Sequence, residues 1–266
     1  MEIAKLNVLK RNNVRVTGKG PPLVFAHGFG CDQNMWRMIA PAFAEKYQII
    51  LFDHVGAGRS DLTSYSRTKY NSLQGYADDV LEIVDELNLA GAIFVGHSVS
   101  SMIGMLAAIK APTKFSNLIM IGPSPCYIDS EGYVGGFSKQ DIDGLLESLD
   151  SNYLGWSAAM APVIMGNAET PSLGEELTNS FCRTNPEIAK HFARVTFMSD
   201  NRHDLHKLQT PTLILQCSDD VIAPVSVGEF LKSKIKNSTL IKMEAKGHCP
   251  NLSSPQETIT AIKAYI

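Results

Sequence analysis

The sequence has no excess of charge of either sign. Lysine and arginine together number 24 and aspartate and glutamate 27, so the formal net charge is −3. No run of five like charges forms an acidic or basic tail. A nucleic-acid-binding surface needs a clustered basic excess, so this sequence predicts no nucleic-acid partner.

Cysteine is also sparse, with five residues that follow no motif. Their number is odd and no CxxC pair occurs, which favours free thiols in a reducing compartment over a disulfide framework. Segment 1–13 lacks an apolar core, so it does not resemble a signal peptide. No apolar stretch approaches the roughly 18 residues of a membrane span. We therefore expect a cytoplasmic protein that has no membrane partner.

Short apolar runs alternate with helical patterns along most of the 266 residues. The runs are apolar almost throughout, which is typical of parallel strands covered on both faces. The strands expected from these runs are residues 22–26, 48–52, 92–95, 118–121, 212–216 and 239–243. An antiparallel hairpin is expected at 6–17, with its turn at 11–13. The alternation predicts an α/β fold with a mostly parallel sheet and helices on both faces.

Only helical patterns occur between residues 125 and 204. A structureless loop of this length is improbable, so we expect a four-helix cap inserted after the sixth strand. The cap would occupy 125–204, and the core would comprise 1–124 and 205–266. The expected cap helices are residues 139–150, 151–165, 173–183 and 186–197. The expected core helices are residues 34–45, 73–88, 98–110, 225–236 and 256–266.

The segment GHSVS at 96–100 has the sequence context of a nucleophilic serine. Five G-x-S triplets occur in the chain, so the triplet alone is weak evidence. Only at Ser98 does a predicted strand end at the first glycine while a long helix begins at the serine. That context lifts a serine to the sheet edge on a sharp turn. The motif ends in Ser100 instead of the usual glycine, but serine is also small.

A nucleophilic serine needs a base and an acid that orients the base. His248 follows the last predicted strand, and Asp220 follows the strand before it, so both reach the same sheet edge as Ser98. The order Ser98, Asp220, His248 is that of the α/β-hydrolases. Asp219 is an alternative acid, and His27 is an alternative base that we interpret as structural.

Motifs for cofactors are missing from the sequence. The glycine pairs in 28–30 and 56–58 lack the third glycine of a dinucleotide-binding loop. There is no Walker A motif, no HExxH and no cysteine or histidine spacing for zinc. His203 and His206 are three residues apart, but they have no third ligand nearby in sequence. We therefore expect neither a metal nor an organic cofactor.

These motifs together resemble the α/β-hydrolase superfamily. The resemblance is carried by HGFG at 27–30, D-x-x-G-x-G-x-S at 53–60, GHSVS at 96–100, D-x-x-x-P at 220–224 and GH at 247–248. Further segments are similar to one subgroup, which holds the bacterial energy-stress regulator RsbQ and the plant karrikin and strigolactone receptors. They look closest to the bacterial member, and they are GFGCDQ, GHSVSSMIGMLA, GPSPCY, GGF, SNYLGW and ILQCSDDVIAP.

The resemblance implies a role for each site residue. Ser98 would be the nucleophile, Asp220 the acid and His248 the base, while the N–H groups of Phe29 and Val99 would form the oxyanion hole. The cap would cover an apolar pocket. Its lining residues would be Phe29, Val99, Tyr127, Phe137, Trp156, Met160 and Phe197.

The activity implied by the resemblance is slow hydrolysis of a small hydrophobic ester or lactone. By the same resemblance, the protein would act in stress signalling as an RsbQ-like positive regulator of the general stress sigma factor. Its partner would then be a PP2C-type phosphatase that carries a PAS sensor domain. The residues leave open the alternative of a metabolic carboxylesterase or lactonase with no signalling partner.

Overall fold

A central sheet organises the computed structural model, which describes residues 7–266. Within these residues the sheet has seven strands in the order β1-β3-β2-β4-β5-β6-β7. The first strand pairs antiparallel with β3, and all the other pairs are parallel. The strands are β1 (Arg15–Thr17), β2 (Pro22–Ala26), β3 (Gln48–Leu51), β4 (Ala92–His97), β5 (Phe115–Ile121), β6 (Thr212–Asp219) and β7 (Ser238–Lys246).

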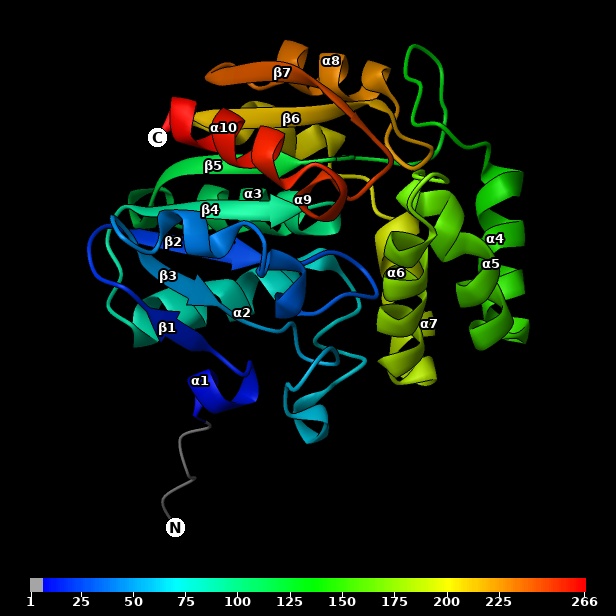
Figure 1. Cartoon of the computed structure of the whole chain (residues 1–266), viewed down its shortest axis with the longest axis horizontal. Helices are drawn as coiled ribbons and strands as arrows, with labels where there is room; N and C mark the ends of the chain where they lie inside the picture. The colour runs from blue at the N-terminus through cyan, green and yellow to red at the C-terminus, as the bar shows by residue number, and fades with distance from the viewer. Residues whose placement is uncertain (1–6) are drawn as a thin grey trace.

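The inner strands, such as β2 and β4, are mostly apolar because both faces of the sheet are buried there, whereas β1 is exposed and β7 combines buried with exposed residues. Neighbouring residues of a strand point to opposite faces, so Leu23 and Phe25 join one hydrophobic cluster while Val24 and Ala26 join the other. Helices α2 (Leu73–Glu86), α3 (Val99–Lys110) and α8 (Val225–Lys234) supply the cluster around Val24. Helix α10 (Pro255–Tyr265) packs on the opposite face (Figure 1).

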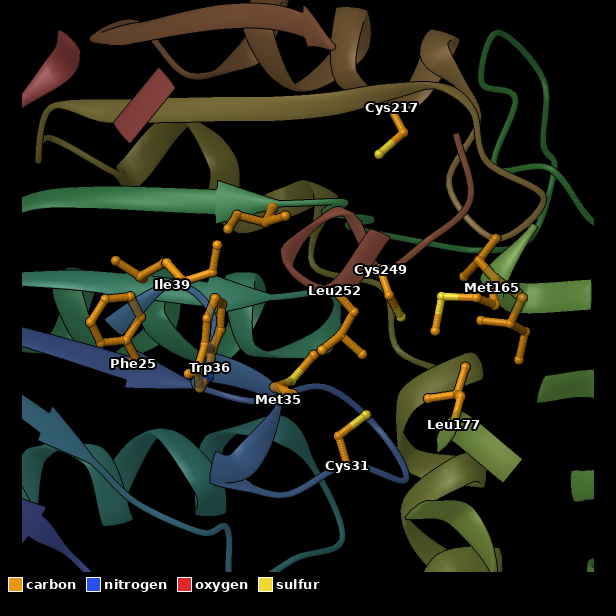
Figure 2. Close-up of a cluster of buried hydrophobic side chains, with 14 of the residues drawn as sticks. Phe25, Cys31, Met35, Trp36, Ile39, Met165, Leu177, Cys217, Cys249 and Leu252 are labelled. Carbon is orange, nitrogen blue, oxygen red and sulfur yellow. The ribbon is translucent and has the colours of Figure 1, made fainter. Parts of the chain in front are cut away.

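Four α-helices lie between β5 and β6 in the chain, beside the edge of the sheet toward which the parallel strands point (Figure 1). We call them the cap helices: α4 (Lys139–Ser151), α5 (Tyr153–Met165), α6 (Pro171–Arg183) and α7 (Pro186–Phe197). Ser138 and Asp141 form a capping box at the start of α4, and Asn185 caps α7. Figure 2 shows the first hydrophobic cluster, which extends from Phe25 in the sheet to Leu177 in the cap.

The expected hairpin at 6–17 is wrong. Leu6 lies outside the described residues, and Val8–Arg11 forms a helical turn, α1, capped by Asn7. The guanidinium of Arg11 is buried in ion pairs with two carboxylates of α2, at 3.0 Å from Asp79 and 2.5 Å from Glu82. These contacts outweigh the strand pattern of the segment. As a result only β1 forms, and the cap follows the fifth described strand instead of the sixth.

The expected helix at 34–45 is also wrong. Two short 3₁₀ helices replace it, η1 (Gln33–Trp36) and η2 (Ala40–Phe43), because Pro41 interrupts the helical hydrogen bonds and Trp36 turns into the core. The short helix α9 (Pro250–Ser253) was not predicted. The remaining 3₁₀ turns are η3 (Leu62–Ser64), η4 (Pro112–Lys114) and η5 (Arg202–Lys207). No helix in the part of the chain from 7 to 266 has the length and apolar character needed to cross a membrane.

Candidate active site

The carboxyl ends of three parallel strands bring Ser98, Asp220 and His248 together. Ser98 lies between β4 and α3, Asp220 directly follows β6, and His248 follows β7. Because these strands point toward the same edge, side chains far apart in sequence meet there. All three are buried, with 4–6 % of each residue exposed.

The turn at Ser98 holds this side chain in a strained position. Its backbone has φ 55° and ψ −124°, a conformation that a residue with a side chain rarely adopts. The turn is tight enough that a Cβ on Gly96 would lie 2.5 Å from the carbonyl oxygen of Ser100. Strain of this kind costs about 1–3 kcal/mol and clusters at functional sites. The arrangement matches the strand–turn–helix context that the sequence predicts.

A chain of hydrogen bonds connects the three side chains. Ser98 Oγ lies 2.7 Å from His248 Nε2, and His248 Nδ1 lies 2.8 Å from Asp220 Oδ2. A carboxylate only accepts, so His248 donates from Nδ1 and its Nε2 is free to accept the hydroxyl proton of Ser98. The second carboxylate oxygen of Asp220 accepts the N–H groups of Ile222 at 2.8 Å and Ala223 at 3.1 Å. Asp220 is thereby held in place as an acceptor.

The alternative residues from the sequence occupy other positions. Asp219 is exposed, and the carboxylate that hydrogen-bonds the imidazole of His248 is that of Asp220. The imidazole Nδ1 of His27 donates to the carbonyl oxygen of the adjacent Gly28 at 2.9 Å, so this ring stabilises the loop after β2. His203 and His206 belong to η5, and residues 7–266 contain no group of three potential metal ligands.

His97, the neighbour of the serine, supports His248 through the backbone. Its Nε2 donates to the carbonyl oxygen of His248 at 2.7 Å. Burial, followed by the nearby His248, lowers the pKa of His97 to about 3. His97 is therefore neutral at physiological pH and acts as a donor that holds the His248 loop against β4.

Two backbone N–H groups lie beside Ser98 without acceptors. Val99 is the first residue of α3, where an N–H has no partner inside the helix. Phe29 follows Gly28, and a Cβ on Gly28 would lie 3.2 Å from Ser98 Cβ. Among the hydrogen bonds of residues 7–266, none is donated by the Phe29 or Val99 N–H. Both N–H groups can therefore donate to a group bound beside Ser98.

A small cavity of about 30 Å³ adjoins Ser98 and His248. Of the predicted lining residues, Phe29, Tyr127 and Phe197 are in its wall. The cavity wall also contains Cys31, His97, Ile164, Leu177, Phe181, Thr196, Ile222 and Cys249. The wall is therefore mostly apolar.

Four predicted lining residues lie outside the cavity wall. Trp156 stands one layer back, because its ring stacks on Phe181 at 5.8 Å and Phe181 takes the inner position. Met160 packs against the core cluster, and Phe137 lies in the loop before α4, where its N–H bonds the Tyr127 carbonyl. The side chain of Val99 is buried in the hydrophobic cluster around Val24, away from the cavity wall.

Sequence reasoning missed the inner face of α6. Leu177 and Phe181 are four residues apart, so they lie on one side of the helix. That spacing was visible, but it does not distinguish a cavity wall from an ordinary core face. Cys249 and Ile222 could have been found from their positions next to His248 and in the Asp220 loop.

Comparison with known proteins agrees with the fold. The model of the alpha/beta hydrolase fold matches residues 21–195. A hydrolase from Oleispira antarctica has a solved structure that superimposes with a TM-score of 0.95, at 42% identity, over 97% of this chain and 96% of that one. The chain therefore belongs to the α/β-hydrolase family, and it is a serine hydrolase of the esterase type.

Within this family the chain is similar to plant receptor hydrolases. It is 38% identical to strigolactone esterase D14 of Arabidopsis thaliana, over 94% of both chains. It is 37% identical to karrikin insensitive 2 receptor IA of Petunia hybrida, over 95% of this chain and 93% of that one. These relatives place the chain in the karrikin and strigolactone receptor-like subgroup.

Proposed function

We propose that this protein hydrolyses a small hydrophobic carboxylic ester or lactone through an acyl-enzyme on Ser98. The observation that carries the proposal is the pair of hydrogen bonds from Ser98 to His248 and from His248 to Asp220, at 2.7 and 2.8 Å. Ser98 Oγ attacks the substrate carbonyl while His248 Nε2 accepts the hydroxyl proton. Asp220 keeps the His248 tautomer in place and stabilises the imidazolium that forms.

The collapse of the tetrahedral intermediate breaks the ester bond. His248 returns its proton to the leaving alkoxide, and the acyl group stays on Ser98. Water then enters, gives a proton to His248 and attacks the acyl carbon, which releases the acid and restores the Ser98 hydroxyl. In both halves the N–H groups of Phe29 and Val99 would bind the oxyanion, and each donor of this kind contributes about 3 kcal/mol.

The cavity limits what the closed protein can hold. About 30 Å³ is room for roughly one water, whereas pockets for drug-sized ligands span roughly 300–1,000 Å³. Its apolar wall supports a hydrophobic substrate. An ester that is larger than this cavity can enter only if side chains of the wall move outward, and we propose that those of Phe181 and Leu177 on α6 do so.

Hydrolysis of p-nitrophenyl acetate by wild type and Ser98→Ala tests the proposal. We expect the mutation to lower kcat/KM by at least about 1,000-fold, because the acyl-enzyme cannot form. Ser172→Ala, an exposed serine in the first turn of α6, is the control and should retain full activity. Equal rates in wild type and Ser98→Ala would refute Ser98 as the nucleophile.

A signalling role is supported by the names of the plant relatives and by the surface of the cap. Helix α5 contains no charged residue, and Leu154 and Val163, which are 55 % and 49 % exposed, lie at opposite borders of its exposed side. The other exposed residues on that side are also uncharged and small or apolar: Gly155, Ala158, Ala159 and Pro162. An exposed apolar helix face is typical of a protein interface. The partner in this proposal is a cytoplasmic PAS-domain PP2C-type phosphatase, and the output is activation of the general stress sigma factor, as in RsbQ. The alternative is a metabolic carboxylesterase or lactonase with no such partner.

Titration of the protein against such a phosphatase from the same genome distinguishes the two roles. The signalling role predicts binding that Leu154→Lys weakens about 10-fold, because a charge is placed in an apolar contact. Leu62→Lys, on the core at a comparable exposure of 47 %, should bind normally. An absence of binding by wild type would favour the metabolic alternative.

A further inference from the structure

A buried cluster of His27, His54 and Ser100 lies behind the site and takes no part in the proposed reaction. The residues come from three segments: His27 follows β2, His54 follows β3 and Ser100 belongs to the first turn of α3. Ser100 Oγ lies 2.8 Å from His54 Nε2 and 2.5 Å from the carbonyl oxygen of His27. The backbone N–H of His54 donates to His27 Nε2 at 3.1 Å. All three residues are buried.

The acceptors and donors in this cluster fix every proton. The His27 carbonyl only accepts, so the Ser100 hydroxyl donates to it, and Ser100 Oγ accepts a hydrogen bond from the Nε2–H of His54. His54 is then the Nε2–H tautomer, and its Nδ1 is the ring nitrogen that has no partner within residues 7–266. Burial lowers the pKa of His54 well below its ordinary value, which agrees with a neutral ring.

The same reasoning assigns the ring of His27. The Nε2 of His27 accepts the backbone N–H of His54, so the ring proton of His27 is on Nδ1. This Nδ1–H donates to the carbonyl of Gly28 at 2.9 Å. The Gly28 carbonyl also accepts the N–H of Cys31 at 3.3 Å. A trans peptide is planar, so its C=O and N–H point in opposite directions. Holding the Gly28 carbonyl therefore sets the direction of the Phe29 N–H.

The peptide unit between Gly28 and Phe29 lies next to Ser98. A Cβ on Gly28 would lie 3.2 Å from Ser98 Cβ, and the Phe29 N–H donates to no group among the described residues. We infer that Ser100, His54 and His27 are positioning residues whose hydrogen bonds aim the Phe29 N–H at the oxyanion formed on Ser98. The inference rests on the proposed function. It gives Ser100 a task that the glycine usual at this motif position cannot perform.

Ser100→Ala removes the central hydroxyl of the cluster. The carbonyl of His27 and the Nε2–H of His54 then lose their partner, and the loop that carries Phe29 loses its tie to α3. We expect kcat for p-nitrophenyl acetate to fall about 10-fold with KM within about 2-fold, since the donor acts in the transition state. The loss should be smaller than the roughly 100-fold or more caused by deleting an oxyanion donor outright.

Ser101→Ala is the matched control. Ser101 is also buried on the first turns of α3, and its hydroxyl donates to a single carbonyl, that of Gly96, at 2.9 Å. It has no bond to the loop of Phe29, so its loss should leave kcat within about 2-fold. Phenylboronic acid adds to a nucleophilic serine as a tetrahedral anion, and its Kd should rise in Ser100→Ala by the same factor as kcat falls.

A ring-nitrogen NMR spectrum of the wild type tests the cluster without any mutation. We expect His54 to carry its proton on Nε2 and His27 on Nδ1. The inference is overturned by the opposite tautomer at His54, by a kcat in Ser100→Ala within 2-fold of wild type, or by an equal loss in Ser101→Ala. A wild type without Ser98-dependent turnover would instead contradict the proposed function, and this inference with it.

Discussion

At the scale of single residues, burial separates the cysteines into two chemical classes. Cys182 is exposed, whereas Cys31, Cys126, Cys217 and Cys249 are buried. Burial raises the pKa of Cys31 to about 12 and also raises the pKa values of the other three. The thiolate is the reactive form, so the buried thiols should be inert although two of them line the cavity.

Ellman's reagent tests this difference at pH 8. We expect one fast thiol per native chain and all five after denaturation. Cys182→Ser should abolish the fast phase while leaving four thiols in denaturant. Two or more fast thiols in the native protein would show that at least one buried thiol is readily reached by solvent.

The residues of the site differed in how far the sequence could predict them. Ser98, Asp220 and His248 each follow a predicted strand, so their meeting at one sheet edge could be deduced from topology. Phe181 could not be distinguished from a core residue, because its helical spacing is the same in both cases. The position of Trp156 behind it depends on ring packing, which no sequence pattern encodes.

At the scale of elements, α6 supplies two apolar side chains, Leu177 and Phe181, to the cavity wall. The ring centroid of Phe181 lies 5.7 Å from that of Phe29 and 5.8 Å from that of Trp156. The Phe181 ring therefore fills the space between the loop that contains Phe29 and α5. Phe181→Ala should therefore enlarge the cavity toward longer acyl chains. We expect kcat/KM for p-nitrophenyl hexanoate relative to acetate to rise about 10-fold, in line with the contribution of a few methylenes.

Leu146→Ala is the control for loss of stability. Leu146 is a buried residue of α4 that does not line the cavity. Both substitutions should lower the free energy of unfolding by about 2–5 kcal/mol. Only Phe181→Ala should change chain-length preference, and an unchanged ratio in that variant would show that α6 does not limit substrate size.

Predictions of elements held where periodicity was sustained and failed where it was short. Strands β2–β7 and the cap helices lie where the apolar pattern indicates them. The segment at 8–11 has too few residues for a period, and its ion pairs with α2 decide its form. At 34–45 the apolar spacing was helical, but Pro41 limits the segment to 3₁₀ turns.

At the scale of the whole molecule, buried neutral histidines couple stability to pH. The folded-state pKa of His97 is about 3, below its ordinary value of 6.5, so between these values the unfolded chain binds the extra proton. The free energy of unfolding should therefore decrease as the pH falls from about 6.5 toward 3. His54 shifts in the same direction and adds to the effect.

Urea unfolding at pH 7, 6 and 5 measures this slope. His97→Gln keeps an N–H donor for the His248 carbonyl but cannot be protonated. Below pH 6 the free energy of unfolding of His97→Gln should change less steeply with pH than that of wild type. The difference in slope should be about 1.4 kcal/mol per pH unit, which corresponds to one proton. His203→Gln, at an exposed site, should keep the wild-type slope, and equal slopes in all three proteins would contradict the assignment.

The two ends of the segment that contains the cap helices meet. Cys126 and Asp200 form an antiparallel bridge, and the Asn201 N–H bonds the Pro125 carbonyl at 2.8 Å, while β5 and β6 pair directly in the sheet. Ser98, Asp220 and His248 lie outside this segment. A single recombination within one contiguous stretch of gene could therefore exchange the cap helices and leave Ser98, Asp220 and His248 in place. The cap helices could therefore be replaced as one unit, in evolution or by protein engineering.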